Sequence, residues 1–199
     1  MCESFIWMDN PSNPFRETAL NTERLALLSV LTAVCLGLQL LPRPMNLEFT
    51  SVISFVTGMV FGSFFGALLG GSVMFANGFL SPYGFAGIVL PFQIASMALI
   101  GVAGGIYSKT TTNKLSAGNF VETVVLGAFL TLIYDVVTNV GTAVYLASSM
   151  PFSEALIAAL IMGAIPSVMH VVWNSFLFGA VTVPLANAMQ KTLVRRLQT

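Results

Sequence analysis

The sequence predicts an all-α integral membrane protein, a compact bundle of six transmembrane helices with both termini in the cytoplasm. Of its 199 residues, 56% are hydrophobic and 8% are charged, and the mean hydropathy is +0.86. A water-soluble core cannot hide that much apolar surface. No charged residue or His occurs between Glu48 and Lys109, a stretch that as helix would run about 90 Å, enough for three crossings. Runs such as VISFVTGMVFG are apolar at consecutive positions, which favours helices over barrel strands.

The first half of the chain is expected to form three helices. The first crosses from Leu25 to Leu41, and the prolines at 42 and 44 end it because proline cannot continue a helix. From Leu47 to Leu80 the chain is too long for one crossing and short for two. The glycine-rich run FGSFFGALLGG therefore predicts two short helices that meet near Gly62.

The second half is expected to form three longer helices, at 85–107, 122–147 and from 153 to about 190. Turn or polar segments at 81–84, 108–119 and 148–151 separate them. Pro166 and Pro184 are expected to bend the last helix. The chain then divides into a short cytosolic N-terminal segment (1–22), a six-helix transmembrane domain (23–190) and a basic cytosolic tail (191–199). The N-terminal segment does not look like a cleaved signal peptide.

The distribution of Lys and Arg predicts the orientation in the plasma membrane. Cytoplasmic loops carry an excess of these residues. With six crossings, all of them except Arg43 fall on the inner side: Arg16, Arg24, Lys109, Lys114, Lys191, Arg195 and Arg196. An odd number of crossings would separate the basic tail from the N-terminal arginines, so the charges also favour an even number.

Polar side chains within the helices are costly in lipid and require a partner or a ligand. Asp135 is the one acid clearly inside a crossing, and Thr138, Asn139 and Thr142 continue its stripe at helical spacing. On the last helix, His170 shares a face with Trp173 and Asn174, at a depth comparable to that of Asp135. Two interpretations follow, a solute pocket or side chains that only satisfy one another between helices.

Other kinds of chemistry have little support in the sequence. It contains no zinc-binding His pair, no nucleophile elbow and no phosphate-binding glycine loop, and we predict no catalytic residue, metal site or cofactor. Cys2 and Cys35 are expected to be free thiols. A net charge of zero argues against nucleic-acid binding.

The run FGSFFGALLGGSVMFANGFLSPYGFAG, followed by a helix ending GVAGGIYSK, resembles the middle of the substrate-binding S components of energy-coupling factor (ECF) transporters. The shared features are a Phe-Gly hinge, a Gly-Ala-x-x-Gly helix entry and a Pro-x-Gly loop. The resemblance extends from Leu25 to Met189 as a pattern of six helices. It implies a protein that is not itself an enzyme, and that binds a vitamin-like solute at the outer face and docks onto a membrane coupling subunit driven by two cytosolic ATPases.

The resemblance and the polar stripes together give candidate residues. Small residues spaced four apart on the first helix are the expected docking face: Ser29, Ala33 and Gly37. The expected solute-binding residues are Asn46, Glu48, Asn77, Tyr83, Gln93, Tyr134, Asp135, Asn139, His170, Trp173 and Asn174. For Glu48, a solvated loop charge paired with Arg43 is the alternative. For Ser29, Ala33 and Gly37, the alternative is ordinary packing inside the bundle.

Two other functions remain open on the sequence. One is a self-sufficient secondary transporter or channel with Asp135 as an intramembrane relay, and the other is a lipid-modifying enzyme that uses Asp135 and His170 as acid and base. The solute is expected to be neutral, zwitterionic or weakly cationic, because Arg43 is the one outward Lys or Arg.

Overall fold

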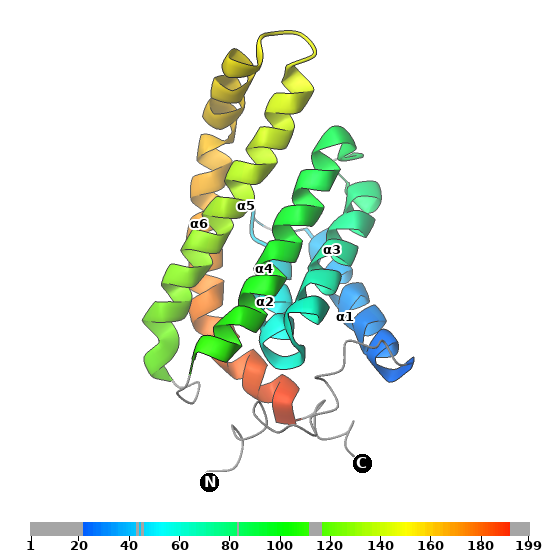
Figure 1. The fold of residues 1–199 in the computed structure, drawn as a ribbon, viewed down its shortest axis with the longest axis vertical. Coiled ribbons are helices and arrows are strands. Elements are labelled where there is room, and N and C mark those ends of the chain that lie inside the picture. Colours follow the sequence, from blue (N-terminus) through cyan, green and yellow to red (C-terminus); the bar gives the residue numbers. More distant parts are fainter. Residues whose placement is uncertain (1–21, 43, 45, 83, 112–116, 192–199) are drawn as a thin grey trace.

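The computed structural model describes residues 22–42, 44, 46–82, 84–111 and 117–191, and these fold into an all-helical bundle (Figure 1). The helices are α1 (Thr22–Leu40), α2 (Thr50–Phe61), α3 (Ser63–Leu80), α4 (Leu90–Thr110), α5 (Phe120–Leu146) and α6 (Phe152–Met189), with the 3-10 helices η3 (Gly87–Val89) and η4 (Ala117–Asn119) before α4 and α5. The predicted helix order is confirmed, including the break at Gly62, whose φ of 100° ends α2 and begins α3.

Two helices begin later than the sequence indicates, in each case because of a positive φ. Before α2, Asn46 has φ 58°, so the helix begins at Thr50 rather than near Leu47. Before α4, Gly84 and Gly87 have φ values of 101° and 56°, and the regular helix begins at Leu90 rather than at 85. The segments just before α2 and just before α4 therefore form two irregular loops, and both border the cavity described below.

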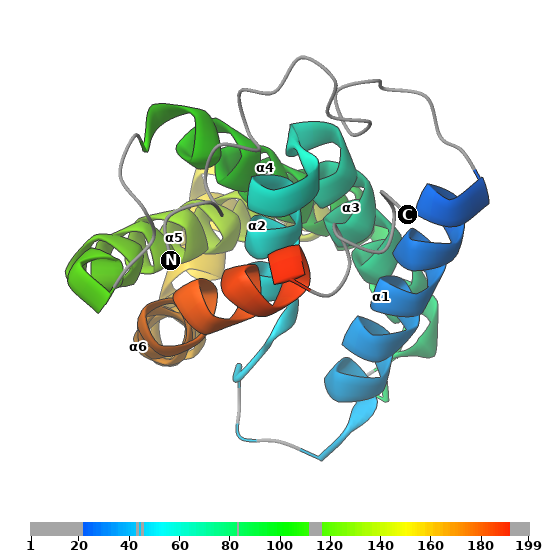
Figure 2. The same ribbon diagram turned by 90° about the horizontal axis from the view of Figure 1, so that it is seen from below.

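The helix α2 lies at the centre of the bundle, with α3, α4 and α6 packed around it (Figure 2). Phe55 and Val56 of α2 are fully buried, and the Phe55 ring contacts those of Tyr107 and Phe178. Close approach of α2, α3 and α4 depends on glycine. A Cβ placed on Gly66 would lie 2.6 Å from the carbonyl oxygen of Gly101. Small side chains here let the backbones of three helices meet without a gap.

The helices α5 and α6 form a long antiparallel pair that extends beyond α3 and α4 at one end (Figure 1). Ala143, Ala155 and Ala159 pack together near that end. Both predicted prolines lie inside α6, Pro166 and Pro184. The segment that contains Pro184 runs obliquely to the part beside α5, as expected for a helix that lacks a backbone hydrogen bond there (Figure 1).

Four helices are long and apolar enough to cross a membrane: Ser63–Leu80, Gly87–Thr110, Phe120–Leu146 and Phe152–Met189. The apolar parts of α1 and α2 are shorter, and 12 residues of α2 span only about 18 Å as helix. The chain thus has the helices of a membrane protein. Six crossings and cytoplasmic termini stay predictions, and the terminal segments 1–21 and 192–199 lie outside the described residues.

The helix α1 lies at the edge of the bundle and packs mainly on α3 (Figure 2). Leu28 and Cys35 face inward and are buried. The three small residues predicted as a docking face, Ser29, Ala33 and Gly37, are exposed. They do not pack inside the bundle, which was the alternative interpretation of their spacing.

Candidate functional site

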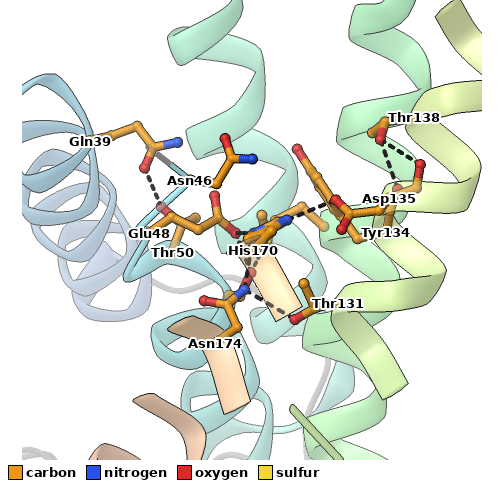
Figure 3. Close-up of polar contacts among 12 residues, drawn as sticks. Gln39, Asn46, Glu48, Thr50, Thr131, Tyr134, Asp135, Thr138, His170 and Asn174 are labelled. Carbon is orange, nitrogen blue, oxygen red and sulfur yellow. Dashed lines mark hydrogen bonds and ion pairs between the residues drawn. The ribbon is translucent and has the colours of Figure 1, made fainter. Parts of the chain in front are cut away.

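A cavity of about 670 Å³ opens where the ends of α1, α3 and α4 meet the middle of α5 and α6. Its floor and walls are mostly polar, and Figure 3 shows several of these side chains converging from different helices. The lining residues are Gln39, Pro44, Asn46, Glu48, Met74, Asn77, Gly78, Ser81, Gly84, Phe85, Ala86, Gln93, Tyr134, Asp135, Thr138 and His170. The volume falls in the range of about 300–1,000 Å³ that is typical of small-molecule sites.

His170 is the centre of a buried hydrogen-bonded cluster beside the cavity. Its Nδ1 lies 2.7 Å from Oδ1 of Asp135, and its Nε2 lies 3.3 Å from Oε1 of Glu48. All three residues are buried, with exposures of 5%, 8% and 5% in that order. An imidazole bound at both nitrogens by carboxylates has a fixed ring orientation, because each nitrogen has one in-plane bonding direction. The prediction that Asp135 and His170 meet is confirmed.

Glu48 reaches this cluster from the chain segment just before α2. The hydroxyl of Ser51, in the first turn of α2, donates a short hydrogen bond to the Oε1 of Glu48. The alternative interpretation of Glu48 as a solvated loop charge is therefore wrong, since its carboxylate is buried against α6. Arg43, the partner in that interpretation, lies outside the described residues.

Further contacts hold the imidazole of His170 in place. The Nδ2 of Asn174 lies 3.0 Å from the Nε2 of His170 and donates to the hydroxyl of Thr131 at 3.1 Å. The ring of Tyr134 packs edge-on against the imidazole, with centroids 5.5 Å apart and an interplanar angle of 83°. Because Asn174 and Tyr134 contact the ring from α6 and α5, His170 is held at the junction of both helices.

The loop between α1 and α2 covers one side of the cavity and is tied to the bundle by polar contacts. The Nδ2 of Asn46 donates to the carbonyl oxygen of Pro166 at 2.6 Å. The hydroxyl of Thr50 donates to Oε1 of Gln39 at 3.4 Å, which joins the start of α2 to the end of α1. These contacts, with the contact of Glu48 to His170, hold the loop against α6.

The structure brings most of the predicted site residues to this one cavity. The predicted residues that line it are Asn46, Glu48, Asn77, Gln93, Tyr134, Asp135 and His170. Asn174 lies behind His170 and supports it. Asn139 and Trp173 do not line the cavity; the amide of Asn139 lies against Gly163, between α5 and α6, and Trp173 is partly buried with no described partner for its Nε1. Tyr83 lies outside the described residues.

Other lining residues were not among the predicted set. Thr138 lies three residues after Asp135, and Met74 and Gly78 lie four apart on α3, so helical spacing from a known site residue indicates them. Gln39 and Ser81 flank the two irregular loops. Whether these two side chains face the cavity depends on the path of the loops, which local sequence patterns do not determine.

Two acceptor atoms of residues that line the cavity lack partners among the described residues. The Oδ2 of Asp135 and the Oε1 of Gln93 are both buried and accept no hydrogen bond there. Such groups carry a cost of about 1–3 kcal/mol each unless something donates to them. No group of three or more His, Cys, Asp or Glu side chains suited to a metal ion was found in the described part of the chain. Both acceptors can therefore still accept a hydrogen bond from a donor outside the described residues.

Comparison of the chain with protein-family models, with curated proteins and with solved structures found no match in any of the three.

Proposed function

We propose that this protein is the substrate-binding membrane component of an ECF-type transporter, which binds a small vitamin-like solute at the outer face. The observation that carries the proposal is the polar cavity of about 670 Å³, with the Glu48, His170 and Asp135 cluster at its edge. Buried charged groups within a membrane bundle are costly and are characteristic of binding or transport sites.

The position of the cavity supports solute capture from one side of the membrane. It lies at the C-terminal ends of α1 and α3 and the N-terminal ends of α2 and α4. In the orientation predicted from Lys and Arg, these ends face outward. The loops before α2 and before α4 border the cavity on this same side.

The motifs that the sequence lacks also fit a protein that depends on partner subunits. The sequence has no phosphate-binding glycine loop, so ATP hydrolysis would come from separate subunits. The exposed small residues Ser29, Ala33 and Gly37 form a face on which a helix of a coupling subunit can approach closely. Delivery inward would then follow docking of α1 onto that subunit.

Two measurements on the native protein test the proposal. The protein is purified gently from its membrane, and the small molecules it releases are identified by mass spectrometry. The same preparation is searched for a membrane coupling subunit and two ATPases. Recovery of a solute together with these subunits supports the proposal, and a preparation that releases no small molecule contradicts it.

A second candidate function is a secondary transporter that uses this cluster as a proton relay. The observation that favours it is that the Nε2 of His170 faces both an acceptor, Oε1 of Glu48, and a donor, Nδ2 of Asn174. The imidazole can therefore hold its Nε2 proton toward Glu48 or accept from Asn174 after losing it. Loss of uptake on protonophore treatment with ATP maintained would favour this candidate, and unchanged uptake would exclude it.

A further inference from the structure

Two of the residues that line the cavity carry a buried atom without a hydrogen-bond partner among the described residues, and both atoms are acceptors. They come from different helices, Gln93 on α4 and Asp135 on α5, and both side chains line the same cavity. The other carboxylate oxygen of Asp135 is already used by His170. No lining residue in the described part of the chain has a buried donor without a partner. The occupant of this cavity is thus expected to bring N–H or O–H donors to these acceptors.

The charges of the lining residues favour some donor groups on the solute over others. The described lining residues include two carboxylates, Glu48 and Asp135, and one imidazole, but no Lys or Arg. An anionic group on the solute would therefore lie near two carboxylates. A positively charged donor instead forms a charge-assisted hydrogen bond, which is about twice as strong as a neutral one.

We propose, building on the solute-binding function above, that the solute carries a cationic N–H donor group, such as an amidinium, guanidinium or ammonium, which is held by the carboxylate of Asp135. Gln93 accepts a further hydrogen bond from the same end of the solute. The rest of the solute is uncharged, because the remaining lining residues are neutral: they include the polar side chains of Gln39, Asn77 and Thr138 and the apolar side chains of Met74 and Phe85.

The test uses three probes that share a ring and differ at one group: benzamidine, which is a cation with N–H donors, benzamide, which is neutral, and benzoate, which is an anion. Calorimetry on the purified full chain measures the affinity for each. We expect benzamidine to bind about tenfold or more tightly than benzamide, the scale of one charge-assisted hydrogen bond, and benzoate to bind most weakly.

Variants connect this preference to Asp135. In Asp135→Asn, which keeps the shape and removes the charge, the preference for benzamidine over benzamide should fall about tenfold or more. The matched control is Glu154→Gln, at an exposed carboxylate in the first turn of α6 that does not line the cavity; it should retain the preference. If Asp135→Asn does not fold, Gln93→Met tests the site instead. It removes the second acceptor without changing the charge, so it should weaken benzamidine binding several-fold.

Other outcomes overturn the inference. Equal affinity for benzamidine and benzamide, tighter binding of benzoate, or no binding of any probe at millimolar concentration would each exclude a cation site at Asp135. An anionic solute recovered from the native protein would do the same while leaving the solute-binding function intact. The proposed function fails separately, when the native protein releases no solute at all.

Discussion

Nδ1 of His170 lies 2.7 Å from Oδ1 of Asp135, which joins α6 to α5 by a direct bond between two buried ionisable side chains. The two residues are 35 positions apart in the chain, and Asp135 is the one acid within α5 beyond its first turn. In lipid, such a bond also fixes the register of the two helices, since a shift of either would leave a polar group unpaired. The pair is therefore expected to stabilise the fold as well as to shape the cavity.

Removal of His170 should test whether Asp135 depends on it. His170→Ala leaves a carboxylate buried without its partner, and breaking a buried pair costs about 3–5 kcal/mol, less whatever the carboxylate recovers by taking up a proton. We expect a lower melting temperature in detergent. When Asp135→Ala is added to His170→Ala, it should lower the melting temperature much less than Asp135→Ala does alone, because the bond is already broken. Fully additive losses of stability would show that the two side chains act independently.

Glycine packing between α2, α3 and α4 gives a second prediction. In Gly66→Ala, the added methyl would lie 2.6 Å from the carbonyl oxygen of Gly101, so the helices must separate. We expect a loss of about 1–3 kcal/mol, measured as a lower melting temperature. Gly71→Ala on the same helix is the control, because its nearest neighbour, a methyl of Ile94, would be 3.6 Å away. Equal effects of both variants would contradict this close packing.

The exposed small face of α1 predicts a separation of binding from transport. Ala33→Leu and Gly37→Leu add bulk where the structure has open surface; a Cβ on Gly37 would have no atom within 4 Å. Both variants should fold and bind solute normally. If the face docks onto a coupling subunit, uptake in cells should be abolished. Val125→Leu, at an exposed position of α5, is the matched control and should transport normally. Loss of solute binding in the α1 variants would instead mean that the face supports the cavity.

The distribution of basic residues predicts the sidedness of the loops. In a Cys2→Ser background, a cysteine placed at Ser149 should react with a membrane-impermeant thiol reagent in intact cells, and one placed at Thr110, an exposed residue at the end of α4, should be shielded. Cys35 is fully buried and should not interfere. Labelling at Thr110 from outside would reverse the predicted orientation, and the cavity would then open toward the cytoplasm.

The helices could be predicted from the sequence because their ends are set locally. Pro42, Gly62 and Pro151 mark helix boundaries that the structure retains, because proline lacks a backbone N–H and Gly62 takes a positive φ. The membrane environment could also be predicted, since composition alone decides whether apolar surface can be hidden from water. Asp135 and His170 were identifiable for the same reason, as polar groups where lipid makes them costly.

The partners of those groups were decided by the tertiary structure. Helical spacing assigns a residue to a broad face and does not show which neighbour meets it. Asn139 continues the stripe of Asp135 yet packs against Gly163, outside the cavity. Glu48 precedes α2 in a loop whose path depends on the φ of Asn46 and its bond to Pro166, 120 positions away. Only the packed bundle brings that loop against His170, because the contact joins segments that no local preference relates.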